Sequence, residues 1–269
     1  QAKTSGGDYS GESKTSSFYF GSLFEFPDEY RLRVGTRVED YSSTVVPRPD
    51  LEKITVGPFV EQWIADMIVE NISATSAVLE DKTLYPSLTL AKDWASGLKA
   101  SISYGETTAR PNFRELAYVE TWDPISDSLF KGNPALKPSE IKNYDIRIDW
   151  NLSETDLISM SVFLKEIENP IQATIGNKDL EIQYNGTVLN WGTGSNTFVN
   201  SDSAEVYGLE LEWKKGLEEY SEYLNGFRIG GNLTWSQSEV KLSEMEMALF
   251  PAETIQPDYQ MLNVSNRST

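Results

Sequence analysis

The feature that most constrains this chain is an alternation of apolar and polar side chains with a period of two residues. Tyr30, Leu32 and Val34 would share one face of a strand, while Arg31 and Arg33 would share the other. Because successive side chains point to opposite faces in a β-strand, the pattern predicts strands that separate an apolar side from a polar side. It predicts nine strands, near residues 16–26, 30–40, 84–92, 98–107, 143–152, 156–167, 204–215, 226–238 and 259–269.

The lengths of these segments and of their connections indicate a membrane protein. Most of the predicted strands have about ten residues, which is the length that a tilted strand needs to cross a bilayer. Short and long connections alternate strictly, as the periplasmic turns and extracellular loops of outer-membrane barrels do. We therefore predict an all-β fold, an antiparallel up-and-down transmembrane β-barrel segment (about nine strands of a larger barrel) with long extracellular loops. The short connections are 27–29, 93–97, 153–156 and 216–226, and the long ones are 41–83, 108–142, 169–203 and 239–257.

Aromatic side chains gather near the ends of the predicted strands. Trp94, Trp150 and Trp213 flank short turns, while Tyr104 and Tyr207 lie toward long loops. Two aromatic belts, one at each membrane interface, are typical of outer-membrane barrels. Tyr144 and Trp150 fit this pattern less well, because only six residues separate them along one strand.

Composition excludes several other kinds of protein. The chain has 41 acidic and 23 basic residues and a formal net charge of −18, which disfavours nucleic acid as a partner. It has neither Cys nor His, so disulfides, metal sites built on those residues and His-based triads are excluded. No apolar run reaches the roughly 18 residues of a transmembrane helix. We expect no metal and no cofactor. Residues 1–14 are polar rather than a signal peptide, so we expect a mature form or an internal fragment.

The first long connection contains one helical pattern. Between 59 and 69, apolar side chains recur at Phe59, Val60, Trp63, Ile64 and Met67, which is the spacing of one helix face. We expect a short helix packed on the loop or on the rim of the barrel, with a lid or a contact for an extracellular partner as the alternative.

The segment from 103 to 150 carries a resemblance to a known family. It has the sequence SYGETTARPNFREL at 103–116, DP at 123–124, GNPALKPSE at 132–140 and NYD at 143–145. Further along, VFLKEIENPI occupies 162–171 and AEVYGLE occupies 204–210. In this order, the motifs resemble those of the barrel of TonB-dependent receptors, and the resemblance spans most of the chain.

The resemblance implies a part of an outer-membrane receptor that imports a bulky nutrient, such as a siderophore, a vitamin, an oligosaccharide or a peptide, by energy-coupled transport. Receptors of this family have a plug domain, a segment that engages TonB and a barrel of about 22 strands, so we expect a fragment that lacks the plug and the C-terminal strands. The implied partners are outer-membrane lipid, the TonB complex through the missing N-terminal part, and a surface lipoprotein. Two alternatives stay open, namely a passive porin-like barrel and a secreted soluble β-protein that binds or cleaves glycans.

The candidate residues fall into two groups. Proline and glycine shape turns and strand ends, so the matching motif has a structural interpretation at Arg110, Pro111, Phe113, Gly132, Asn133, Pro134, Leu136, Lys137, Pro138, Asn143 and Tyr144. Candidate ligand-binding residues in the lumen or the loops are Arg31, Arg33, Arg37, Arg110, Arg114, Glu115, Asp145, Arg147, Asp149, Glu210 and Glu212. Paired carboxylates such as Asp145 with Asp149 could serve a glycosidase. Their alternation with basic residues favours a charged lumen wall instead, and we expect no catalytic residue.

Overall fold

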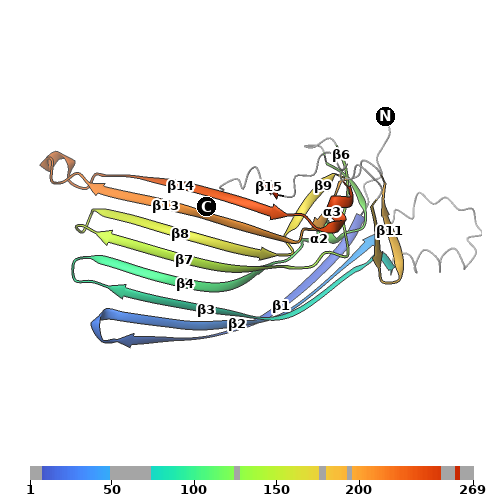
Figure 1. Ribbon diagram of the computed structural model, residues 1–269, viewed down its shortest axis with the longest axis horizontal. Helices are drawn as coiled ribbons and strands as arrows, with labels where there is room; N and C mark the ends of the chain where they lie inside the picture. The colour runs from blue at the N-terminus through green and yellow to red at the C-terminus, as the bar shows by residue number, and fades with distance from the viewer. Residues whose placement is uncertain are drawn as a thin grey trace, which may run out of the picture.

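The computed structural model describes residues 8–48, 74–123, 128–175, 180–192, 196–249 and 258–260. Its main feature is a nine-stranded sheet with the order β1-β2-β3-β4-β7-β8-β13-β14-β15, in which all neighbours are antiparallel. Figure 1 shows these strands as one continuous wall. The predicted all-β, up-and-down class is therefore confirmed. The strands are β1 (Asp8–Phe26), β2 (Tyr30–Arg48), β3 (Ala77–Asp93), β4 (Leu98–Ala109), β7 (Ser139–Asn151), β8 (Leu157–Glu168), β13 (Ser203–Gly216), β14 (Arg228–Lys241) and β15 (Asp258–Gln260).

Several strands extend further than their side-chain alternation indicates. β1 begins at Asp8 and β2 ends at Arg48, well beyond the predicted limits of 16 and 40. The register continues without a break to the pair Asp8–Arg48. Ladder hydrogen bonds join backbone groups, so the hairpin can continue where the regular alternation of apolar and polar side chains has ended.

The four short connections lie together at one end of the sheet (Figure 1). β1 and β2 are joined by the 3-10 turn η1 (Pro27–Glu29), in which Asp28 has a φ of 61°. The β3–β4 turn ends at Gly97, whose φ of 80° suits a residue without a side chain. The β13–β14 connection is longer and contains η3 (Glu222–Leu224); it is closed by a hydrogen bond from the Leu217 amide to the Phe227 carbonyl at 3.0 Å.

The long connections at the other end are more ordered than loops. Their described residues contain a four-stranded sheet, a two-stranded hairpin and the two short helices α2 and α3. The predicted helix at 59–69 lies outside the described residues. The four-stranded sheet consists of β5 (Glu120–Asp123), β6 (Ser128–Lys131), β12 (Asn196–Asn200) and β9 (Ile171–Ile175), the hairpin of β10 (Leu180–Tyr184) and β11 (Thr187–Trp191), and the helices are α2 (Phe113–Leu116) and α3 (Glu244–Leu249).

The buried apolar clusters lie in this loop region and at the adjoining strand ends. One cluster is built around Trp191 and Leu189, with Val199 from β12. The second places Leu116 of α2 against Val45 of β2, together with Ala77, Ala117 and Leu136. Trp191 and Leu116 are each only 1% exposed, so the loops form a packed unit on the strand ends.

The two faces of the large sheet differ sharply, and we call them the apolar face and the polar face. The apolar face carries the aromatic and aliphatic residues of the alternating pattern, and these stay exposed: Phe18 is 71% exposed, Ile102 53% and Leu233 65%. A continuous apolar surface of this size in a folded protein marks a contact with lipid or with another protein. The polar face carries the charged partners of the same pattern, including Arg31, Asp145 and Glu212.

The cross-strand rows are inclined relative to the line of turns. The row that starts at Phe26 beside the first turn reaches Leu233 on β14, five residues from the start of that strand at Arg228. If the four turns lie at one level, strand rise and spacing give a tilt of roughly 30°, close to the range of closed barrels. The same inclination places Tyr144 in a row with Val34, which is four residues nearer the first turn than Val38. The apolar stretch of β7 is therefore displaced toward the turns.

Candidate functional site

The polar face gathers the predicted lumen residues onto one wall. Arg31 lies in a cross-strand row that continues through Ser101 to Arg147, Ser161 and Glu210. Asp149 and Glu212 lie in the next row toward the turns, while Arg33 and Asp145 lie in the next row toward the loops. Residues that are distant in sequence are thus brought side by side by the register.

The arginines of β2 differ in their partners. Arg31 forms an ion pair with Asp93 at 2.7 Å across the β2–β3 ladder. Arg37 pairs with Glu39 on its own strand. Arg33 has no ion-pair or hydrogen-bond partner among the described residues, and its side chain is exposed. Of Arg31, Arg33 and Arg37, Arg33 therefore has the guanidinium group that is available to a ligand.

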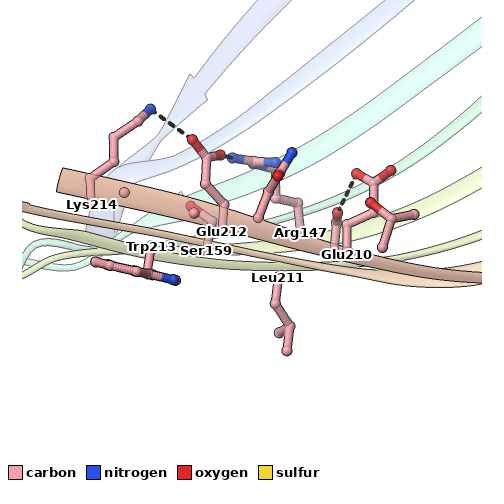
Figure 2. Close-up of a pocket in the computed structure, with 12 residues that line it drawn as sticks. Arg147, Ser159, Glu210, Leu211, Glu212, Trp213 and Lys214 are labelled. Atoms are coloured by element: carbon pink, nitrogen blue, oxygen red, sulfur yellow. Dashed lines mark hydrogen bonds and ion pairs between the residues drawn. The ribbon is translucent and has the colours of Figure 1, made fainter. Parts of the chain in front are cut away.

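A second group of charges lies on β7 and β13 and borders a pocket of about 400 Å³. Arg147 pairs with Asp149 at 2.8 Å and approaches Glu212 at 3.7 Å, and Lys214 contacts Glu212 at 2.7 Å. Figure 2 shows Arg147, Glu212 and Lys214 on the same side of the sheet. Their opposite charges compensate one another, so the group behaves as a hydrogen-bonding network rather than as a charged patch.

The rest of the pocket is polar and partly open. Ser161 donates a hydrogen bond to Glu210 at 3.3 Å, and β14 contributes Asn232 and Thr234 to the lining. Gly230 also lines it, where a Cβ atom would come within 2.8 Å of the Trp213 carbonyl oxygen. Leu211 and Trp213 extend to the other side of the sheet in Figure 2.

Arg110 lies at the loop end of the wall, where it joins β2, β3 and the chain that leaves β4. Its two terminal nitrogens donate to Glu39 and to Asp81, each at 2.8 Å, and one also donates to the Tyr85 hydroxyl at 3.1 Å. The guanidinium lies 4.4 Å from the centre of the Tyr41 ring. Burial alone would lower the pKa of Arg110, but the hydrogen bonds to Asp81 and Glu39 hold it above its ordinary value. The group stays charged and acts as a fixed junction.

The residues after Arg110 fold back over the inner side of the strand ends. Asn112 and Glu115 form a reciprocal capping box at the start of α2. Phe113 packs over Gly11 of β1, where a Cβ atom would come within 2.7 Å of the ring. Arg114 lies 5.2 Å from the centre of the Phe130 ring. Glu115 is thus engaged in the local fold, while Arg114 is exposed beside an aromatic side chain.

The motif at 132–138 fastens one long connection to another. A side chain on Gly132 would collide with the carbonyl oxygens of Ala117 and Arg114. Asn133 donates to the Phe198 carbonyl at 2.9 Å, and the Lys137 amide donates to the Asn200 side chain at 2.8 Å.

The other motif residues also take part in packing. Leu136 belongs to the second buried cluster, Pro111 and Pro134 are buried, and Pro138 is half-buried. At the start of β7, Asn143 donates to the Gly105 carbonyl at 3.2 Å. Tyr144 packs against Tyr104 on the apolar face, with ring centres 5.2 Å apart.

Sequence reasoning missed some members of these groups. Asp81 falls in the long connection predicted at 41–83 and Asp93 in the turn predicted at 93–97, although both pair with arginines. Lys214 and Asn232 follow the polar alternation, and that signal could have included them. Within the described residues no group of three or more acidic side chains gathers as a metal site would require, and no helix there is long and apolar enough to cross a membrane.

The comparison with family models gives one assignment. The model described as "TonB dependent receptor-like, beta-barrel" matches residues 2–267. A comparison with curated protein sequences finds no match. Members of the matching family are transport receptors of the outer membrane of Gram-negative bacteria, not enzymes.

Solved structures share the fold. The chain is similar to the ferric-catecholate import receptor Fiu from E. coli K12, with 14% identity, a TM-score of 0.54 and coverage of 87% of this chain and 29% of that chain. It is also similar to the alcaligin outer-membrane receptor FauA from Bordetella pertussis, with 16% identity, a TM-score of 0.51 and coverage of 88% of this chain and 33% of that chain. A third similar structure is the copper transporter OprC, with 13% identity, a TM-score of 0.52 and coverage of 88% of this chain and 31% of that chain.

At these identities the likeness concerns the fold alone, and the chain spans 29–33% of the length of these neighbours. The family match covers nearly the whole chain, and the open sheet has an apolar outer face and a polar inner face. This chain belongs to the TonB-dependent receptor family and forms part of an outer-membrane β-barrel.

Proposed function

We propose that residues 1–269 form one segment of the barrel domain of a receptor that imports a bulky nutrient across the outer membrane by energy-coupled transport. The observation that carries the proposal is the family match over residues 2–267. The charged, hydrogen-bonding polar face supports it, because a lumen wall must stay in contact with water and solute. The family match also favours an import receptor over a soluble glycan-binding protein.

The proposed division of roles follows the contacts of each residue. Arg33, Asp145, Arg147 and Glu210 face the lumen and would meet a ligand on its way through the barrel. Arg110 and the motif residues around Gly132 would instead hold the extracellular loops over the entrance. Arg114 is exposed on that loop unit and is a candidate for first contact with a ligand.

Two protein partners belong to the same proposal. Energy coupling requires the TonB complex of the inner membrane, which would act through a part of the receptor outside this chain. A surface lipoprotein could deliver the ligand to the extracellular loops. Outer-membrane lipid would cover the apolar face, where Phe18, Ile102 and Leu233 are exposed.

A comparison of deletion strains tests energy coupling. Strains that lack this gene, tonB, or both should show the same growth defect on whichever nutrient the receptor imports, in a screen of sole carbon, nitrogen and iron sources. An uncoupler that collapses the proton gradient should abolish uptake of that nutrient. Uptake that depends on this gene but continues without TonB would refute the proposal and support a passive porin-like barrel.

A further inference from the structure

The pocket beside Arg147 has few positive charges that an anionic ligand could use. Both of its cations contact Glu212, Arg147 at 3.7 Å and Lys214 at 2.7 Å, and Arg147 also pairs with Asp149 at 2.8 Å. An anionic ligand would have to compete with carboxylates that are already in place. The pocket therefore disfavours anionic chelates.

Glu210 is a polar group of the pocket with unused hydrogen-bonding capacity. A carboxylate has about four acceptor positions, and within the described residues the one group that donates to Glu210 is the Ser161 hydroxyl, at 3.3 Å. On β14, Thr234 lies opposite Glu210 and Asn232 lies opposite Glu212 in the register. An acceptor, a hydroxyl and an amide thus border the same space.

The pocket has a mixed lining, with polar groups beside apolar side-chain atoms. Leu211 and Trp213 extend to the other side of the sheet (Figure 2), and Gly230 presents no side chain at all. A volume of about 400 Å³ lies within the range of small-molecule sites. The pocket therefore suits a ligand that carries no anionic group, is densely polar, and can both donate and accept hydrogen bonds.

We infer that this pocket is a subsite for a neutral oligosaccharide on its way through the barrel, an inference that rests on the proposed import function. Neighbouring sugar hydroxyls would donate to Glu210 and accept from the Asn232 amide and the Thr234 hydroxyl. Arg33, which has no hydrogen-bond or ion-pair partner in the described part of the chain, lies on β2 and takes no part in this pocket.

Calorimetric titration of the intact detergent-purified receptor tests the subsite. The probes are malto-, xylo-, manno- and arabino-oligosaccharides, together with a ferric siderophore and a short peptide. At least one neutral oligosaccharide should bind saturably. Glu210→Gln and Asn232→Ala should each weaken its binding about tenfold, because each loses one direct hydrogen bond to the ligand.

Two variants serve as matched controls. Glu205→Gln changes a carboxylate on the same strand that points to the opposite side of the sheet, and Arg33→Ala changes a charge on the polar face outside the pocket. Both should leave saccharide affinity within twofold of the unmodified receptor.

Two results would overturn the subsite. One is the absence of saturable binding for every neutral oligosaccharide, and the other is equal affinity in the Glu210→Gln, Asn232→Ala and control receptors. TonB-dependent uptake of a siderophore or peptide in the first case would preserve the proposed function while removing this subsite. Saccharide uptake that continues without TonB, with the two pocket variants still impaired, would preserve the subsite. It would refute the proposed energy-coupled import.

Discussion

Replacing Arg110 by Met should release the loop unit from the wall. The substitution keeps much of the side-chain volume but leaves Glu39 and Asp81 without their shared cation, and the side chains of these residues are only 7% and 18% exposed. Removing one partner of a buried ion pair costs about 3–5 kcal/mol. Arg37 still contacts Glu39, so we expect the lower end of that range, about 3 kcal/mol.

This destabilisation can be measured at the loop amides. The Asn133 amide donates to the Glu115 carbonyl at 2.6 Å and is protected only while the loop after Arg110 is folded back. A change of about 3 kcal/mol corresponds to a factor of roughly one hundred in an opening equilibrium. Hydrogen exchange of the intact receptor in detergent should therefore show the amides of 112–133 exchanging roughly a hundredfold faster, while strand amides in 143–150 stay unchanged.

Two further variants isolate the cause. Arg33→Met removes an arginine of the same face that has no partner in the described residues, and it should not alter exchange in 112–133. Arg110→Lys keeps the charge but not the two-pronged donor geometry, so its effect should be intermediate. Equal exchange in Arg110→Met and the unmodified receptor would refute the role of Arg110 as a junction.

Three other predictions follow from single contacts. Gly132→Ala should destabilise the loop unit by about 2 kcal/mol, because the new methyl group meets two backbone carbonyls, and limited proteolysis at the loops should accelerate; unchanged cleavage would contradict the packing. Leu233→Arg should make the free energy of membrane insertion about 2–4 kcal/mol less favourable if the residue faces the bilayer core. The loss should be seen on gels as less heat-resistant folded protein. Thr234→Arg on the polar face should be tolerated. The hydrogen bonds from Lys215 and the Gly216 amide lower the pKa of Asp156, so the contribution of Asp156 to turn stability should be lost as pH falls through that lowered pKa. Proteolysis within 217–227 should therefore rise on acidification. The Asp156→Asn variant should remove this pH dependence.

The strands of the large sheet could be predicted because their information is local. A two-residue alternation such as Tyr30 to Val38 shows both that a strand forms and which face meets lipid. Antiparallel neighbours joined by short turns then fix the order β1-β2 or β7-β8 without any long-range knowledge.

The loop unit could not be predicted in the same way. Its strands β5, β6 and β9 to β12 have four or five residues each, too few for a clear alternation. Its stability depends on distant pairs, such as Asn133 with Phe198 and the Trp191 ring nitrogen, which donates to the Lys131 carbonyl at 3.2 Å.

The state of each charge also depends on register. Sequence alone placed Arg31, Arg33 and Arg37 on one face, but it could not show that Arg31 is paired with Asp93, 62 residues away, while Arg33 stays free of partners in the described residues. For the same reason the pocket beside Arg147 became visible only when β7, β8, β13 and β14 were aligned.

The most direct test of the account is the alternation of environment along β7 in the outer membrane. This chain has no native Cys. In a receptor whose cysteines outside this chain, if any, are replaced by Ser, single cysteines at positions 144 to 149 can each carry a spin label without background. Labels at 144, 146 and 148 should be accessible to oxygen dissolved in lipid, and labels at 145, 147 and 149 to a water-soluble relaxation agent. Uniform accessibility along the strand, or water contact at 146 and 148, would contradict a wall that separates lipid from lumen.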